Sequence, residues 1–242
     1  MTAAVRLHRR RGRESDGATL LEGPHLLEAA LAAGIEPERV FVAGGDAVGA
    51  ALARSSGGEV LLVDARTLAK LATTATPQSP VAVVAIPDSD ASPGGRVLVS
   101  WGVSDPGNCG TLIRIAAAFG YGYLAGPESA DVWSPKVLRA AAGAHFAARL
   151  GRVATIAEVR FGGRVVVATV ARGGTPPGPL PVAAAVLVGS EAHGLPDAIV
   201  AAADLRFTIP TTGHVESLNA AVAGAIVAYV GALGTATNLR GS

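Results

Sequence analysis

The segment that decides the fold is residues 105–114, which read DPGNCGTLIR. It follows the apolar run 97–100, which is typical of a buried strand, and it leads into an apolar stretch, 111–119, that predicts a helix ended by Gly120. The segment therefore places Pro, Gly and small polar residues where a strand gives way to a helix. In open α/β sheets such strand-to-helix loops form the ligand-binding edge.

Two later segments have the same character. Residues 188–195 read VGSEAHGL and follow the apolar run 185–188, and residues 209–219 run from Ile-Pro to Ser-Leu-Asn ahead of a long apolar stretch. Three such loops predict one site assembled from distant parts of the chain.

Composition narrows the class of protein. The chain has 242 residues, 50% of them hydrophobic, and a formal net charge of +1, which predicts a globular protein with a substantial core. No apolar run reaches the roughly 20 residues that span a bilayer, and the N-terminus lacks a signal-peptide pattern. We expect a cytoplasmic protein without membrane association. A single cysteine, Cys109, and five scattered histidines predict no metal site.

Strand and helix patterns alternate along the first 87 residues, with strands expected at 18–21, 39–42, 60–62 and 81–85. A polar stretch rich in Pro and Gly, residues 88–95, then interrupts the pattern. Further strands are expected at 97–100, 123–125, 164–168, 185–188 and 205–209, followed by a final helix over 218–233. The sequence thus predicts a small α/β domain, residues 1–90, and a second domain, 91–242, with a mostly parallel sheet.

The N-terminal segment carries a cluster of basic residues. Arg9, Arg10, Arg11 and Arg13 could neutralise phosphates, because the guanidinium group offers a planar fork of donors. The alternative is a solvated tail without a binding role.

Common nucleotide and hydrolase motifs are absent. The glycines of residues 107–110 do not form the G-x-G-x-x-G fingerprint of dinucleotide-binding proteins, and neither lysine follows a P-loop glycine run. Ser190 lies in GSEA rather than in the G-x-S-x-G elbow of serine hydrolases. These absences argue against a dinucleotide enzyme, an ATP phosphotransferase and a serine hydrolase.

The three segments resemble the motifs of the SpoU (TrmH) family of RNA 2′-O-ribose methyltransferases, within the SPOUT superfamily. The family motifs D-P-x-N-x-G-x-x-x-R, G-S-E-x-x-G-L and I-P…S-L-N occur in order between residues 97 and 230. Residues 21–25 and 76–81 resemble the substrate-binding domain, similar to a ribosomal protein, that precedes the catalytic domain in many members. The resemblance implies an α/β fold whose C-terminal domain is a SPOUT-type, trefoil-knotted, mostly parallel sheet with helices on both faces.

The resemblance also implies that S-adenosylmethionine binds in the knotted loops. Family members hold the adenosine largely through backbone groups of the second and third motifs, which here correspond to Gly189, Ile209 and Leu218. A glycine allows close backbone approach, and the aliphatic residues offer apolar contact to adenine. Without the resemblance, the same residues would be a turn glycine and two core aliphatics.

In the family the motif arginine, here Arg114, faces the reacting ribose. A guanidinium is essentially always protonated, so we expect Arg114 to position the ribose and stabilise negative charge on O2′ rather than act as a base. Considered alone, Arg114 could equally lie on a solvated helix edge or in an ion pair.

Four further residues belong to the catalytic centre by resemblance. Asn108 lies near the substrate and is also placed to cap the following helix, while Glu191 could orient the RNA, hold its own loop or be a surface carboxylate. Ser217 and Asn219 lie beside Asn108 in the family, and Ser217 could equally cap the last helix.

The expected function is S-adenosylmethionine-dependent 2′-O-methylation of structured RNA by a homodimer, with ribosomal RNA as the favoured target and transfer RNA as the alternative. The chain could instead be a non-catalytic RNA-binding or ribosome-assembly protein that retains the fold, or a cofactor-binding α/β protein unrelated to RNA.

Overall fold

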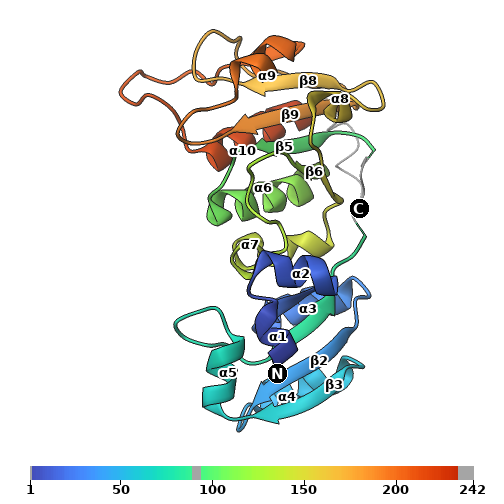
Figure 1. Cartoon of the computed structure of the whole chain (residues 1–242). Coiled ribbons are helices and arrows are strands. Elements are labelled where there is room, and N and C mark those ends of the chain that lie inside the picture. The colour runs from blue at the N-terminus through green and yellow to red at the C-terminus, as the bar shows by residue number, and fades with distance from the viewer. Residues whose placement is uncertain (1, 89–93, 234–242) are drawn as a thin grey trace. The chain divides into compact units, whose positions relative to one another are not determined.

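The computed structural model describes residues 2–88 and 94–233, which form two compact units (Figure 1). One unit combines the N-terminal residues up to Asp88 with Asp131–Ala147, and the other contains the remaining residues. The expected division into residues 1–90 and 91–242 differs from this one in residues 131–147, which group with the first unit although they lie deep in the second half of the sequence.

The first unit is built on a sheet with the strand order β1-β4-β2-β3, in which β4 is antiparallel to both of its neighbours and β2 is parallel to β3. Its strands are β1 (Ala18–Glu22), β2 (Pro37–Ala43), β3 (Glu59–Val63) and β4 (Val81–Ala85). The four strands expected in this part of the sequence are therefore confirmed. Buried aliphatic residues cover both faces of the sheet and make two separate cores.

The helices of this unit cover both faces of its sheet. They are α1 (Thr2–Arg6), α2 (Arg10–Asp16), α3 (Pro24–Ala32), α4 (Ala47–Ser55), α5 (Ala65–Leu71), α7 (Pro135–Ala141) and the 3₁₀ turn Ala144–Phe146. Leu138 of α7 is fully buried in the core that Leu21 and Leu27 share. Residues 131–147 therefore complete the hydrophobic core of the unit. The basic N-terminal segment forms the helices α1 and α2.

The second unit contains a six-stranded sheet with the order β10-β8-β9-β5-β6-β7, and every pairing in its described part is parallel. The strands are β5 (Val97–Trp101), β6 (Gly122–Ala125), β7 (Leu150–Arg152), β8 (Val165–Thr169), β9 (Ala184–Gly189) and β10 (Leu205–Phe207). The predicted α/β class with a mostly parallel sheet is confirmed. Strand β7 was not expected from the sequence.

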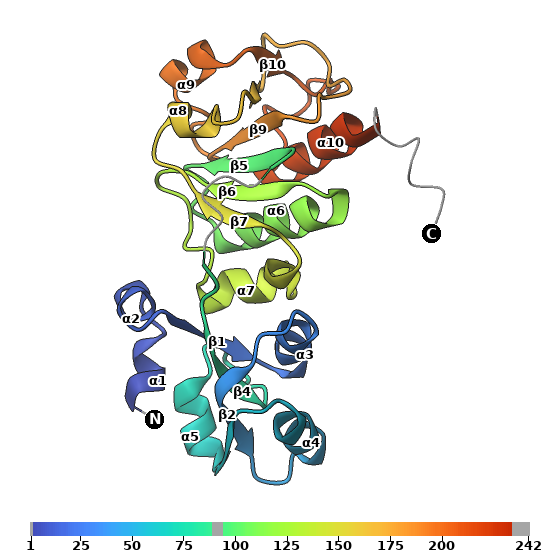
Figure 2. The same cartoon turned by 90° about the vertical axis from the view of Figure 1, so that its right-hand side faces the viewer.

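Helices lie on both faces of this sheet (Figure 2). They are α6 (Pro106–Phe119), α8 (Ile156–Val159), α9 (Asp197–Ala202) and α10 (Ala220–Leu233). Residues of α8 and α9 pack on the face that carries Val97 and Leu187, whereas α6 and α10 pack together on the other face. Gly224 of α10 permits this close packing, because a Cβ there would lie 2.5 Å from Leu112 of α6.

Helix α6 begins earlier than the sequence pattern indicated. Pro106 is its first residue, and Asp105 is the N-cap, whose carboxylate accepts a 2.8 Å hydrogen bond from the backbone N–H of Asn108. The expectation that Asn108 is the N-cap is therefore wrong. Aspartate followed by proline is a favoured helix start, since proline lacks the N–H that an N1 residue would leave unpaired.

Candidate functional site

The three motif loops leave the same edge of the second sheet. Strands β5 and β9 are parallel neighbours, with Trp101 opposite Gly189, so the loops that follow them both start at the carboxyl edge. The third loop, residues 208–219, joins β10 to α10, and α10 packs against α6 and β9. This arrangement brings together segments that are far apart in sequence.

Asn108 connects all three motifs through its side-chain amide. Its Nδ2 donates a hydrogen bond to Oε1 of Glu191 in the second motif, and its Oδ1 accepts one of 2.9 Å from Nδ2 of Asn219 in the third. Three of the five residues expected in the catalytic centre therefore form one hydrogen-bonded cluster, which we call the Asn108 cluster: Asn108, Glu191 and Asn219.

Asn219 has a second role in this arrangement. Its Oδ1 accepts hydrogen bonds of 2.9 Å and 3.2 Å from the backbone N–H groups of Ala221 and Val222 in the first turn of α10. A side-chain oxygen that satisfies these N–H groups acts as a helix cap. The cap of α10 is thus Asn219 rather than Ser217, and capping fixes the amide that reaches Asn108.

A pocket of about 560 Å³ lies between the second and third motif loops and the end of β8. Gly189, Glu191, Ile209, Ser217 and Leu218 all line it. The three residues expected to hold a cofactor therefore share one cavity with two of the residues expected in the catalytic centre. Asn108 and Arg114 are not among the described lining residues, and Asn108 reaches the pocket through its bond to Glu191.

Gly189 is required by the close approach of its own loop. A Cβ at this position would lie 2.2 Å from the carbonyl carbon of Gly194 and 2.3 Å from the nitrogen of Leu195. The loop closes here through paired backbone hydrogen bonds of 3.1 Å and 2.9 Å between Ser190 and Gly194. The glycine is needed first for the shape of the pocket wall, since any side chain would meet backbone atoms.

The pocket also contains residues that the sequence did not single out. Arg172, Asp197 and Glu216 line it together with Thr169 and Val170 at the end of β8. Because β8 is the parallel neighbour of β9, its carboxyl end meets the same sheet edge. Strand order could have indicated the residues after β8, but strand order is not evident from one sequence. The mixture of apolar wall and charged side chains suits a ligand that has both apolar and charged groups.

Arg114 lies on α6 with an exposed side chain. The hydrogen bonds of the Asn108 cluster do not involve it. The helix places Arg114 two turns beyond the N-cap, where it is accessible to a large substrate. The structure therefore leaves this arginine in solvent.

A buried polar chain lies beneath the first motif. The hydroxyl of Tyr123 donates a 2.8 Å hydrogen bond to Ser100 Oγ and lies 3.2 Å from the thiol of Cys109, the residue after Asn108. Ser100 Oγ in turn lies 3.0 Å from Ser129 Oγ. Burial raises the pKa of Tyr123 well above its ordinary value, so the hydroxyl keeps its proton. Cys109 is fully buried, which agrees with a packing role rather than that of a nucleophile.

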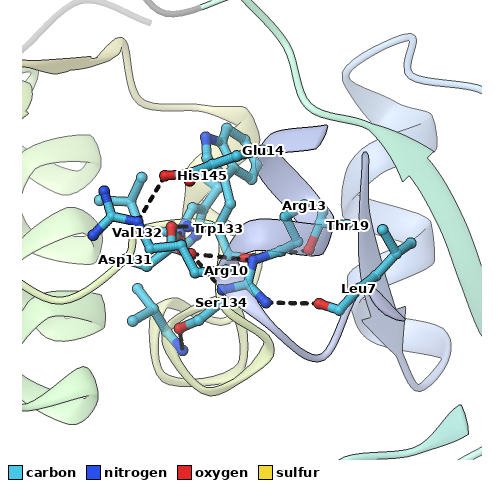
Figure 3. A network of polar contacts seen from close by, with 11 residues as sticks. Leu7, Arg10, Arg13, Glu14, Thr19, Asp131, Val132, Trp133, Ser134 and His145 are labelled. Atoms are coloured by element: carbon cyan, nitrogen blue, oxygen red, sulfur yellow. Dashed lines mark hydrogen bonds and ion pairs between the residues drawn. The ribbon is translucent and has the colours of Figure 1, made fainter. Parts of the chain in front are cut away.

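The basic N-terminal cluster divides into exposed and buried members. Arg9, Arg10 and Arg11 are exposed, and Arg10 forms a 2.7 Å surface ion pair with Glu14. Arg13 is only 3% exposed, donates a 2.6 Å hydrogen bond to the carbonyl of Leu7 and forms an ion pair with Asp131 (Figure 3). Its guanidinium is therefore occupied inside the first unit and is not presented to a phosphate.

Among residues 2–88 and 94–233, no group of three or more His, Cys, Asp and Glu side chains is placed to hold a metal ion. Within the same residues, no helix combines the length and hydropathy needed to cross a membrane.

Comparison with known proteins identifies relatives along the whole chain. Residues 95–229 match the SpoU rRNA Methylase family, and residues 2–82 match an MRM3-like substrate binding domain. The 23S rRNA (guanosine(2553)-2′-O)-methyltransferase RlmP of Bacillus subtilis is 32% identical over 230 residues, which are 93% of this chain and 92% of that protein.

Solved structures show the same architecture. The SpoU methyltransferase AviRb of Streptomyces viridochromogenes in complex with AdoMet superposes with a TM-score of 0.85 at 26% identity, covering 99% of this chain and 97% of that one. The AdoMet-bound rRNA methyltransferase of Sinorhizobium meliloti superposes with a TM-score of 0.82 at 28% identity, covering 95% and 92%. The match over residues 95–229 and the Bacillus relative of similar length show that the chain belongs to the SpoU rRNA methylase family.

Proposed function

We propose that this protein transfers the methyl group of S-adenosylmethionine to the ribose 2′-hydroxyl of structured RNA, with ribosomal RNA as the favoured substrate. The observation that carries the proposal is the Asn108 cluster, which links three motif loops at the wall of one pocket. It is supported by the AdoMet complexes of two structural relatives and by the 23S rRNA specificity in the name of the Bacillus relative.

Gly189, Ile209 and Leu218 would hold the adenosine, because they form the backbone-rich and apolar part of the pocket. S-Adenosylmethionine supplies an activated methyl group when bound. Transfer of the methyl group to O2′ would leave S-adenosylhomocysteine, and the proton of the ribose hydroxyl would pass to solvent.

Arg114 would lie beside the reacting ribose and stabilise the charge that develops on O2′. A guanidinium group offers hydrogen-bond donors and no acceptor, so the favoured role is electrostatic positioning rather than proton abstraction. The Asn108 cluster would hold the motif loops at the spacing that the RNA and the methyl donor require. Ser217, which lines the same pocket as Glu191, would contribute to this centre.

The first unit would bind the RNA. Its match to a substrate-binding domain supports this role, and the exposed side chains of Arg9, Arg10 and Arg11 provide phosphate contacts. Arg13 is not part of the proposed RNA surface, because its side chain is buried and forms an ion pair with Asp131.

A homodimer is proposed through an apolar stripe on α10. Val222, Ile226, Tyr229 and Leu233 are spaced by four, three and four residues, which places them on one side of the helix. Val222, Tyr229 and Leu233 are 48%, 53% and 49% exposed, and the ring of Phe119 lies 5.8 Å from that of Tyr229. An exposed stripe of this kind fits a second copy of the chain. We also propose that the C-terminal domain forms a trefoil knot and that the protein is cytoplasmic, as expected from the family resemblance and the sequence.

The test is transfer of tritium from labelled S-adenosylmethionine to ribosomal RNA and to transfer RNA, both isolated from a strain lacking the enzyme. Alkaline hydrolysis of the product should release a labelled dinucleotide, because a 2′-O-methyl group blocks cleavage at that position. Label in ribosomal RNA alone supports the favoured substrate, and label in transfer RNA alone shifts the assignment. RNA binding without transfer to either RNA, or to ribosomal particles, would establish a non-catalytic binder.

A further inference from the structure

The buried polar chain beneath the first motif lies in a largely apolar layer of the second unit. Helix α6 packs on β5 and β6, and its fully buried side chains include Leu112 and Ile113 (Figure 2). In the same layer Ser100, Cys109 and Tyr123 are each 0% exposed. Apolar contacts are not directional, whereas a hydrogen bond between buried groups requires one particular geometry. The polar chain can therefore fix where α6 lies on the sheet.

Tyr123 is the central member of this chain. Its hydroxyl donates its one proton to Ser100 Oγ at 2.8 Å, so its oxygen can accept from the thiol of Cys109 at 3.2 Å. Ser100 Oγ donates to Ser129 Oγ at 3.0 Å, and Ser129 Oγ donates back to the carbonyl of Ser100 at 3.1 Å. Each of the three hydroxyls thus both donates and accepts. A buried polar network in which every member is paired favours a single arrangement.

The polar chain ends at the residue next to Asn108. Cys109 directly follows Asn108 in the first turn of α6, and all members of the chain and of the Asn108 cluster belong to the second unit. The amide of Asn108 must meet Asn219 at 2.9 Å and Glu191 at the same time. Amide hydrogen bonds keep their strength only over about 2.7–3.2 Å between the heavy atoms. A small shift of α6 on the sheet would therefore break the Asn108 cluster.

We propose that Tyr123 is a positioning residue for methyl transfer: its hydroxyl joins β5 to the first turn of α6 and thereby holds Asn108 at its two partners in the other motifs. The inference rests on the proposed function for the task of the Asn108 cluster. Neither Tyr123 nor Cys109 is among the described residues that line the pocket. Tyr123 therefore acts through the position of Asn108 and not through contact with the methyl donor.

The experiment compares two variants that each lose one buried tyrosine hydroxyl. Tyr123→Phe keeps the ring and removes the bonds to Ser100 and Cys109. The matched control is Tyr121→Phe, because Tyr121 is 2% exposed and its hydroxyl donates a 3.1 Å hydrogen bond to the carbonyl of Ala228 in α10. Both variants should melt below the wild-type temperature, since each leaves a buried group without its partner. Only Tyr123→Phe should alter the first motif.

In Tyr123→Phe we expect kcat at saturating RNA to fall at least fivefold, while the Kd for S-adenosylmethionine stays within twofold of the wild-type value. The NMR signals of the side-chain amides of Asn108 and Asn219 report on the bond between them and require no activity. These signals should shift by more than their line width in Tyr123→Phe. In Tyr121→Phe the signals, kcat and Kd should all match the wild-type chain.

A double-mutant cycle tests whether Tyr123 acts through Cys109. Cys109→Ala removes the thiol and should lower kcat at least threefold, whereas Cys109→Ser keeps a donor for Tyr123 and should stay within twofold of the wild-type value. The double variant with Tyr123→Phe and Cys109→Ala should lose no more activity than Tyr123→Phe alone, because both changes break the same bond.

Equal kcat in Tyr123→Phe and Tyr121→Phe, unchanged amide signals of Asn108 in Tyr123→Phe, or additive losses in the double variant would each overturn the proposal. If Tyr123→Phe does not fold, the amide signals and kcat of Cys109→Ala and Cys109→Ser decide between the same outcomes. A wild-type chain that methylates no RNA would refute the proposed function, and the amide signals would still decide whether Tyr123 holds Asn108.

Discussion

The side-chain amide of Asn219 donates a hydrogen bond of 2.9 Å to Asn108 while its carbonyl oxygen caps α10. One side chain thus uses its two ends for different tasks. Capping orients the amide group, and the oriented amide holds Asn108 toward Glu191. Helix α10 and the first motif are in this way joined at a single residue, which ties the end of the third motif to the start of α6.

Replacement of Asn219 can separate these two tasks. Asn219→Ala removes both the cap and the bond to Asn108. It should lower the free energy of unfolding by about 1 kcal/mol, the usual contribution of a helix cap, and it should also lower kcat. Asn219→Asp keeps a capping oxygen but has no donor for Asn108, so it should melt near the wild-type temperature and still lose at least tenfold in kcat. Thermal melting and tritium transfer measure the two effects. Equal activity of Asn219→Asp and the wild-type chain would show that the bond to Asn108 is dispensable.

Arg114→Ala should lower methyl transfer by about 100-fold or more, the range seen when a preorganised electrostatic group is lost. Binding of S-adenosylmethionine, measured by calorimetry, should remain, since Arg114 is not among the described pocket residues. Arg54, another exposed arginine on a helix, provides the matched control when it is changed to Ala. Full activity of Arg114→Ala would remove this residue from the proposed centre.

Gly189→Ala should weaken binding of S-adenosylmethionine at least tenfold, because the added Cβ meets backbone atoms of Gly194 and Leu195 and must displace the pocket wall. Gly178→Ala is the control in the same unit, where a Cβ has no described atom within 4 Å. Isothermal calorimetry on both variants tests the difference. Wild-type affinity in Gly189→Ala would mean that the loop can relax without cost to the pocket.

Much of the fold could be predicted because its elements have strong local signals. The apolar runs of β1 to β4 and the motif strands β5 and β9 stand out from their Gly- and Pro-rich surroundings. Strand β7 has only the residues Leu150–Arg152, too few for a recognisable pattern. No local sequence signal places residues 131–147 in the first unit, since a leucine such as Leu138 could pack in the hydrophobic core of either unit.

For the candidate site, the proximity of three residues could be predicted, whereas their catalytic roles stay predictions. The resemblance to the family motifs indicated Asn108, Glu191 and Asn219, which are joined by hydrogen bonds. The capping roles of Asp105 and Asn219 were not predicted, because the apolar pattern placed the starts of α6 and α10 a few residues away from where they lie. Arg13 appeared equivalent to its neighbours in the basic cluster. Its burial depends on Asp131, a partner 118 residues away in sequence, and such long-range pairing cannot be deduced from one chain.

Tyr229→Asp should convert the proposed dimer into a monomer, because it places a charge in the middle of the apolar stripe on α10. Val48→Asp is the control, as Val48 is 75% exposed on α4 in the first unit and lies outside the stripe. Sedimentation velocity on both variants and the wild-type chain measures the change. A wild-type monomer, or a Tyr229→Asp dimer, would contradict the proposed interface.

Stability should fall as the pH drops from 7 to 5 because of His145. Burial lowers the pKa of His145 to about 4, against the opposing influence of its hydrogen bond to Val132 and of Asp131. The unfolded chain binds a proton near pH 6.5 and the folded chain does not, so the free energy of unfolding decreases between these two pKa values as pH falls. With about 1.4 kcal/mol per pKa unit, the loss between pH 7 and pH 5 should be about 2 kcal/mol.

His145→Gln, which can still donate to Val132 but does not titrate, should lack this dependence. Urea unfolding of both proteins at several pH values measures it, and parallel curves would show that His145 does not cause the loss.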